Sequence, residues 1–142
     1  MNLNEIQTMW NQDSKIDIDN LQDESLKISS LHAKYYEIYN NLLLLRKKQE
    51  QENNKLLHEK YEYYTGKADK EVYEQNPYDK KIRDKDHLEK TLSADKQLGD
   101  NKLQVMYYDT MLKYLEDIIK MIHNRGFQIK NSIEYIKFTA GF

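Results

Sequence analysis

The chain has 142 residues, of which 32% are charged and 39% hydrophobic, and its mean hydropathy is −0.97. Four glycines and one proline leave long helices almost uninterrupted, and the absence of cysteine excludes disulfides and thiol catalysis. The net charge of −2 does not by itself indicate a nucleic-acid-binding protein. We therefore expect one all-α domain, residues 1–142, that completes its apolar burial by forming a homo-oligomer.

The first predicted helix covers residues 4–12 and places its apolar side chains, Ile6, Met9 and Trp10, on one side. A short charged linker follows. Asp19 is a good N-cap for the next helix, and Gln22 completes a capping-box pattern with it.

A long helix is predicted from Asn20 to Tyr64, because this stretch contains neither glycine nor proline. Its heptad positions are apolar at seven of eight places as far as Leu45, and beyond that the apolar seam fades. Gly66 is a natural helix terminator, so residues 1–66 form the short and the long helix. The eight heptad positions are Leu21, Glu24, Ile28, Leu31, Tyr35, Ile38, Leu42 and Leu45.

The polar residues 67–76 predict a mobile loop. Pro77 after Asn76 is typical of a helix start, so a further helix is expected from Pro77 into the 90s. Gly99 is expected to interrupt the helical structure. The C-terminal part, residues 77–142, is therefore expected to form two or three helices.

The most apolar helix is predicted over residues 103–122, and Gly126 is expected to stop or kink it. A second apolar face follows in residues 127–138. These two faces are our candidates for assembly, and the residues assigned to it are Leu115, Ile118, Ile119, Ile122, Phe127, Ile129, Ile133, Ile136 and Phe138.

Motifs for catalysis are missing from the sequence. No histidine pair has the spacing of a zinc-binding helix, no nucleophile motif is present, and no glycine-rich loop precedes a helix. We therefore expect no enzyme activity, no metal and no cofactor. A metal site built from carboxylates remains the enzymatic alternative, because any acidic helix could supply one.

Basic residues alternate with tyrosines around the end of the long helix. Residues 31–70 hold eight Lys or Arg against six acids, whereas residues 1–30 hold two against six. Such a surface can hold single-stranded nucleic acid through cations on the phosphates and aromatic rings under the bases. The alternative is that Tyr63 or Tyr64 packs on a neighbouring helix while the lysines are only solvated. The candidate binding residues are Arg46, Lys47, Lys48, Lys55, His58, Lys60, Tyr61, Tyr63, Tyr64, Lys67 and Lys70.

Four segments together resemble the UvsY family of phage recombination mediators. They are YYTG at Tyr63–Gly66, TLSADK at Thr91–Lys96, NRGFQIKN at Asn124–Asn131 and the terminal AGF. The resemblance runs from the first of these segments to the C-terminus and rests on their order and spacing. Over the first 50 residues only a similar helical pattern is visible.

The resemblance implies a non-catalytic protein that binds single-stranded DNA and forms a ring of six or seven copies. Its implied partners are a RecA-like phage recombinase and the phage single-strand-binding protein, and its implied place is the cytoplasm of the infected host. It also implies DNA contacts just before the YYTG turn, at His58 and Lys60, and assembly through the C-terminal region. Glu59 beside His58 weakens the first contact, and Lys60 carries a point charge where the family has arginine.

These observations favour a recombination mediator that helps to load the recombinase onto coated single-stranded DNA. The alternative is a structural or scaffolding helical oligomer with no affinity for DNA. The apolar run at Leu42–Leu45 is far shorter than the ~20 residues needed to span a bilayer, and the first residues lack the pattern of a signal peptide, so no membrane partner is expected.

Overall fold

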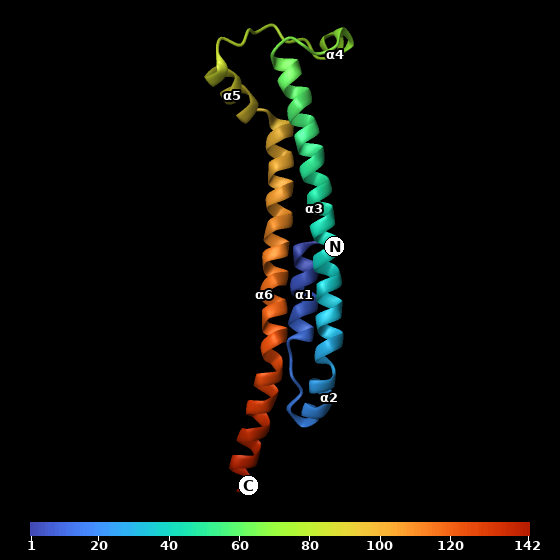
Figure 1. The fold of residues 1–142 in the computed structure, drawn as a ribbon, viewed down its shortest axis with the longest axis vertical. Coiled ribbons are helices and arrows are strands. Elements are labelled where there is room, and N and C mark those ends of the chain that lie inside the picture. The colour runs from blue at the N-terminus through green and yellow to red at the C-terminus, as the bar shows by residue number, and fades with distance from the viewer. The chain divides into compact units, whose positions relative to one another are not determined.

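The computed structural model describes all 142 residues, and all of its regular elements are helices. The predicted all-α class is confirmed. No helix has an apolar stretch of the length that crossing a bilayer requires. In chain order the elements are α1 (Leu3–Asp13), the 3₁₀ helix η1 (Ile18–Asn20), α2 (Leu21–Leu26), α3 (Ile28–Tyr64), α4 (Lys70–Gln75), α5 (Lys85–Ser93) and α6 (Lys96–Thr139), as labelled in Figure 1.

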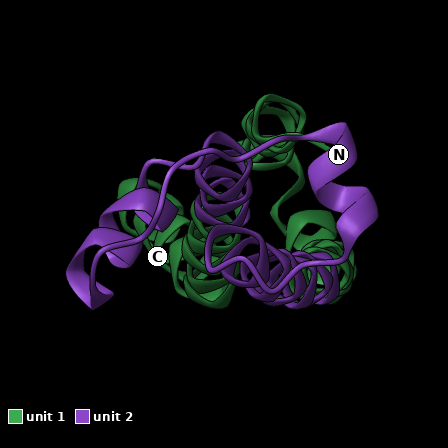
Figure 2. Cartoon of the chain, turned by 90° about the horizontal axis from the view of Figure 1, so that it is seen from above, with its two compact units in different colours: residues 1–43, 109–142 green, residues 44–108 purple.

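The chain divides into two compact units, which Figure 2 shows in different colours. Unit 1 combines Met1–Leu43 with Asp109–Phe142, and unit 2 is the continuous stretch Leu44–Tyr108. The two long helices, α3 and α6, each contribute one part to unit 1 and another to unit 2.

Unit 1 contains most of the apolar core. In it α1 lies beside α3 and α6 (Figure 1), and the ring of Trp10 meets the ring of Tyr35 edge-on at 5.4 Å between centroids. Of the side chains predicted to share one side of α1, Ile6 and Trp10 are buried in this core and Met9 is half-buried, as the apolar spacing predicts. Its buried apolar residues are Ile6, Trp10, Tyr35, Leu42, Met111, Leu112, Leu115, Ile118, Ile122 and Ile129.

The one charged residue in the predicted heptad seam, Glu24, is also buried in unit 1. Its Oε2 accepts a hydrogen bond from Arg125 Nη2 at 3.0 Å. The same guanidinium donates to the backbone carbonyl oxygens of Asp13 and Lys15, both at 3.0 Å. Glu24 is therefore the acceptor for a buried arginine, whose role the sequence analysis did not identify.

Unit 2 has a much smaller apolar core, since Leu98 is its only buried apolar side chain. Its two long helices are joined partly by polar contacts, such as the hydrogen bond from Asn53 Nδ2 to the carbonyl oxygen of Asn101 at 3.1 Å. This agrees with a heptad seam that fades after Leu45.

The start of the long helix differs from the prediction. The capping residue is Asp17, whose side chain accepts from the amide of Asp19 at 3.0 Å, so the proposed capping box at Asp19 is wrong. The predicted single helix is also divided at Lys27 into α2 and α3. Helical bonds bridge this residue, from Lys27 N to Asp23 O and from Leu31 N to Lys27 O, so the interruption is only one residue long.

The segment between the long helices also differs. Residues 67–76 were expected to be loop, yet they contain α4. No helix starts at Pro77: the helix begins at Lys85, where Asp84 accepts a hydrogen bond from the amide of His87 at 2.8 Å. Proline lacks the amide that would continue α4, so here Pro77 follows the end of a helix rather than starting one.

The predicted break at Gly99 and the predicted stop at Gly126 are wrong, because α6 runs through both from Lys96 to Thr139, whereas a kink at Gly126 stays a prediction. A helical glycine costs about 1 kcal/mol relative to alanine. Buried neighbours on the same helix, Leu98 beside the first glycine and Ile122 and Ile129 around the second, offset that cost.

The residues assigned to assembly fall into two groups within unit 1. Four of them, Leu115, Ile118, Ile122 and Ile129, are buried inside the protomer, and Ile119 is half-buried. The other four are exposed: Phe127, Ile133, Ile136 and Phe138.

Candidate nucleic-acid interface

The end of α3 is fixed by a glycine in the left-handed conformation. Gly66 has φ +78°, its amide donates to the carbonyl oxygen of Tyr63, and the amide of Lys67 donates to that of Glu62 at 2.9 Å. These two bonds form a Schellman motif, which satisfies the last carbonyl groups of a helix. The sequence prediction that Gly66 terminates the long helix is confirmed. The turn thereby fixes the direction in which the chain leaves the tyrosine-rich last turn.

Two of the three clustered tyrosines pack inside unit 2. The rings of Tyr63 and Tyr73 stack at 5.4 Å, and those of Tyr64 and Tyr78 meet edge-on at 5.2 Å. The hydroxyl of Tyr63 donates to the carbonyl oxygen of Asn76 at 2.9 Å, and that of Tyr73 donates to the carbonyl oxygen of Tyr63 at 2.7 Å. These four rings therefore hold the segment after α4 against the end of α3, as the alternative from the sequence proposed for Tyr63 or Tyr64.

Asp95 accepts three hydrogen bonds at the start of α6. The Tyr64 hydroxyl donates to its Oδ2 at 2.6 Å, Lys60 Nζ lies 3.2 Å from the same oxygen, and the amide of Leu98 donates to its Oδ1 at 3.0 Å. The carboxylate side chain is only 5% exposed. Burial opposes its ionisation, but the hydrogen bonds from Tyr64, Leu98 and Lys60 outweigh burial and lower the pKa of Asp95 below 3.8. The carboxylate is therefore ionised at neutral pH.

Tyr61 is the outward-facing member of the tyrosine run. It is 40% exposed, and Lys67 Nζ lies 5.8 Å from the centre of its ring. This is a cation–π contact, and it places a positive charge next to an accessible aromatic face. Of the three tyrosines at the end of α3, Tyr61 is the one whose ring is available to stack on a base.

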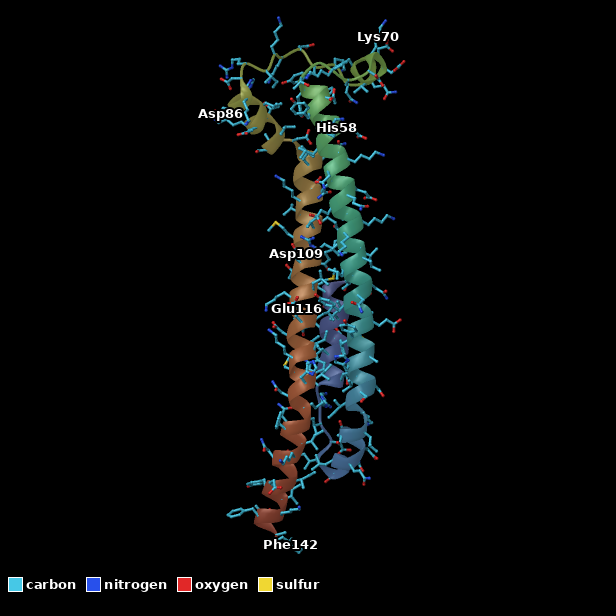
Figure 3. All side chains as sticks on the ribbon, viewed as in Figure 1. His58, Lys70, Asp86, Asp109, Glu116 and Phe142 are labelled. Atoms are coloured by element: carbon cyan, nitrogen blue, oxygen red, sulfur yellow. The ribbon has the colours of Figure 1, made fainter.

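His58 and Lys70 are also accessible in unit 2, the first on α3 and the second at the start of α4 (Figure 3). The side chain of His58 is 75% exposed, and its Nε2 lies 3.8 Å from Glu62 Oε1. An imidazole this exposed beside a carboxylate is a weak anchor for phosphate while it is neutral.

A groove of about 780 Å³ runs along this end of unit 2. It combines residues of α3 with residues of α4 and of the start of α6. Lys60 and Lys67 both line it, together with the acidic residues Glu59, Glu62 and Asp69. The groove therefore carries both positive and negative charges. Its affinity for an anion depends on which of its cations are not paired with a carboxylate of the protein.

The remaining predicted cations lie further back along α3, in unit 2. Arg46 pairs with Glu50 at 3.1 Å, so part of its charge is compensated. Lys47, Lys48 and Lys55 are exposed.

Two lysines that the sequence analysis did not select also lie at this end of unit 2. Lys80 and Lys81 are exposed and line a smaller hollow with Tyr63, Tyr73 and Tyr78. The sequence predicted a helix from Pro77 into the 90s, and this prediction obscured the position of the two lysines. Their signal was available: the cations in DKKIRDK, residues 79–85, lack helical apolar spacing.

Metal ligands are not assembled in this structure, since no three His, Asp or Glu side chains form a group able to hold an ion. His32 and His123 come close in unit 1, with ring centroids 5.3 Å apart, but no third ligand joins them.

Comparison with known proteins decides the family. The family model described as "Recombination, repair and ssDNA binding protein UvsY" matches residues 9–142. The chain belongs to the UvsY family. The resemblance noted in the sequence is thereby confirmed, and it extends over nearly the whole chain.

UvsY relatives agree in sequence and in fold. The recombination protein UvsY of Enterobacteria phage T4 is 25% identical over 141 residues, which cover 99% of each chain. One crystal structure of the phage T4 recombination mediator protein UvsY has a TM-score of 0.84 at 25% identity and covers 99% of both chains. Another has a TM-score of 0.83 at 22% identity and covers 98% of this chain and 99% of that one.

Membership of the UvsY family establishes the general role. The family is one of non-enzymatic recombination, repair and single-stranded DNA-binding proteins, so the prediction of a protein without catalytic activity is confirmed.

Proposed function

We propose that this chain binds single-stranded DNA along the end of α3 and the groove beside it, in unit 2. The observation that carries the proposal is the exposed pair of Tyr61 and Lys67 next to a groove that Lys60 also lines. Cations that hold the phosphates and a ring that stacks on a base are the two parts of a sequence-tolerant single-strand site, and each stacked base contributes ~1–3 kcal/mol. His58, Lys70 and the exposed lysines of α3 extend this basic surface.

We further propose that the bound strand is passed to a RecA-like recombinase on DNA coated by single-strand-binding protein. The family description as a recombination protein supports this role, and so does the mediator activity named for the phage T4 relative. In this proposal the protein bends and captures the strand, which loosens the coating protein and presents the DNA to the recombinase. No nucleotide is hydrolysed by the mediator itself.

A ring of six or seven copies is part of the proposal. Unit 2 holds 14 Lys or Arg against 13 Asp or Glu, so one protomer offers little net attraction for DNA. Identical weak sites on a ring gain affinity through their high effective concentration. The exposed apolar side chains near the C-terminal end of α6 support such an assembly.

The test is binding of a fluorescent oligothymidylate, measured by anisotropy at several salt concentrations. Lys67→Ala is expected to weaken binding. It should also make the slope of log binding constant against log salt concentration shallower by about 0.7 for each protomer that loses a phosphate contact. Lys120→Ala, an exposed lysine of α6 in unit 1, is the matched control and should bind like the wild type.

Absence of salt-sensitive binding by the wild type would favour the scaffolding alternative instead. For the handover, the recombinase's DNA-dependent ATP hydrolysis on coated DNA should start sooner when the wild-type protein is present. An unchanged lag would contradict the loading role.

A further inference from the structure

Lys60, which the resemblance made the principal phosphate contact, is already paired with a carboxylate in this structure. Its Nζ lies 3.2 Å from Asp95 Oδ2, and its side chain is 21% exposed. The ammonium group therefore has an anion of the protein itself in the position that a phosphate oxygen would take. Any DNA contact made by Lys60 must share or replace this pair.

Asp95 is held in place without help from Lys60. Its Oδ1 caps α6 by accepting from the amide of Leu98, and its Oδ2 accepts from the Tyr64 hydroxyl at 2.6 Å. Lys60, in contrast, has a flexible four-carbon side chain and makes a hydrogen bond or ion pair only with Asp95. The lysine can therefore turn away while the carboxylate stays where it is.

The groove gives the lysine a place to turn to. Lys60 lines it together with His58, Tyr63 and Lys67, and its Nζ lies 5.9 Å from the ring centre of Tyr63. A strand in this groove would bring phosphates within reach of the lysine. The fixed carboxylate of Asp95 would compete for the same ammonium group.

We propose that Asp95 sets the DNA affinity of the site by competing with phosphate for Lys60. This inference rests on the proposed single-stranded DNA site and identifies a residue that limits its strength. In the free protein the Asp95 carboxylate is paired with the Lys60 ammonium group. When DNA binds, a phosphate group replaces the carboxylate in some or all of that contact. The competition weakens the contact between Lys60 and the DNA phosphate in every protomer. A weaker contact suits a protein that must release the strand to a second protein.

The contact also explains why substituting Lys60 alone is an ambiguous test. Lys60→Ala removes a cation but leaves the Asp95 carboxylate uncompensated beside the groove. Weaker binding would then follow from the lost contact, from repulsion of phosphate by Asp95, or from both. The informative change is at Asp95.

Asp95→Asn removes the charge and keeps the geometry. Asparagine is as good an N-cap as aspartate, because its Oδ1 can still accept from the Leu98 amide. Its Nδ2, which replaces the carboxylate Oδ2, can donate to the Tyr64 hydroxyl oxygen. Oligothymidylate binding by anisotropy should become about fivefold tighter, the upper end of what an ion pair near the protein surface contributes, because the Asp95 side chain is itself little exposed. The salt slope should steepen by about 0.7 for each protomer in which Lys60 is released to a phosphate.

Two controls separate this effect from a general change in charge. Asp117→Asn also removes one negative charge from α6, where Asp117 pairs with the exposed Lys113 at 3.3 Å, and it should bind like the wild type. The double variant Lys60→Met with Asp95→Asn should lose the gain that Asp95→Asn gives. Equal affinity of Asp95→Asn and Asp117→Asn, or weaker binding by Asp95→Asn, would overturn the proposal.

A second measurement uses the wild-type protein and so does not depend on how the variants fold. A water-soluble carbodiimide joins amine and carboxylate groups that are in direct contact, and mass spectrometry of peptides measures the yield. A saturating oligonucleotide should lower the yield of the Lys60–Asp95 link and leave the Lys113–Asp117 link unchanged. An unchanged Lys60–Asp95 yield on DNA-bound protein would contradict the competition, whereas a wild type that binds no DNA would contradict the proposed function itself.

Discussion

Arg125 satisfies most of its hydrogen-bonding groups inside unit 1, although it is only 3% exposed. Its two terminal nitrogens donate to Glu24 and to the last carbonyl groups of α1 and the residues after it, whereas Nε has no partner. Carbonyl groups at a helix C-terminus attract positive charge, so the guanidinium also stabilises the end of α1. This one side chain thus links α1, α2 and α6.

Arg125→Met should therefore be strongly destabilising. The substitution leaves Glu24 buried without a counter-charge, and breaking one partner of a buried pair typically costs about 3–5 kcal/mol in the free energy of unfolding. Urea unfolding followed by circular dichroism would measure this loss.

Lys120→Met is the control on the same helix, because Lys120 is exposed; its effect should stay within about 0.5 kcal/mol. Adding Glu24→Leu to Arg125→Met removes the stranded carboxylate and should restore part of the stability. No recovery in the double variant would show that the carbonyl contacts, and not the ion pair, carry the effect.

The same carboxylates predict how stability depends on pH. The hydrogen bond from Arg125 outweighs burial and lowers the pKa of Glu24 below 4.5; for Asp13, burial opposes ionisation, but the bonds from Lys34 and Tyr35 lower its pKa below 3.8. A pKa depressed by folding means that the stabilisation is complete above the unfolded-state value and is lost as the pH falls. The melting temperature should therefore fall as the pH drops below about 4.5, and Glu24→Gln should make that fall shallower. An equally steep acid loss in Glu24→Gln would exclude Glu24 as a contributor.

At the scale of helices, the sequence predicted the elements that local chemistry determines. The apolar spacing around Ile6 and Trp10 located α1, and Gly66 located the end of α3. It did not predict the break at Lys27, which no glycine or proline marks, or the continuity of α6 through Gly99 and Gly126. Those features depend on tertiary contacts, which local propensity does not contain.

The candidate site divides in the same way. The basic and aromatic character of residues 58–70 was visible in the sequence, and so was the alternative that Tyr63 or Tyr64 packs inside the protomer. The pairing of Lys60 with Asp95 was not visible, because 35 positions separate the two in the sequence and the fold alone brings them together. Tyr73 and Tyr78 were missed because they lie in a segment that was assigned to loop and helix.

Gly66 and Gly99 differ in backbone conformation, so replacing each with alanine should change stability in opposite directions. Gly66→Ala should lower the free energy of unfolding by about 1–2 kcal/mol, because an alanine side chain disfavours φ +78° although it meets no atom within 4 Å. Gly99→Ala should raise it by up to about 1 kcal/mol, because Gly99 is helical and its added methyl group also meets nothing within 4 Å. Urea unfolding would measure both, and shifts of the same sign would contradict this account of the two positions.

At the scale of the whole molecule, the basic candidate site and the exposed apolar surface belong to different units. Unit 2 holds the candidate DNA residues, whereas the exposed apolar residues 127–138 belong to unit 1. Phe142 extends this apolar end of α6 (Figure 3). The two proposed roles, strand binding and assembly, are thus carried by separate sets of residues, so one set can be substituted while the other stays unchanged.

Ile136→Ser combined with Phe138→Ser should reduce the particle mass in solution while the helix content stays the same. Both side chains are exposed in the protomer, Phe138 at 80%, so their loss creates no internal cavity. Deleting residues 127–142 is a less specific test, because it also removes the buried Ile129. Light scattering would measure the mass, and circular dichroism the helix content.

Leu26→Ser is the control for this assembly test, since Leu26 is an equally accessible apolar residue of unit 1 outside the C-terminal face, and its particle mass should match that of the wild type. The double variant should also bind oligothymidylate more weakly, although no proposed DNA contact has changed, because separate protomers lose the effective concentration that linked sites provide. A particle of wild-type mass would contradict the assembly role of residues 127–138. A smaller particle with undiminished DNA affinity would instead show that a single unit 2 surface holds the strand without help from its copies.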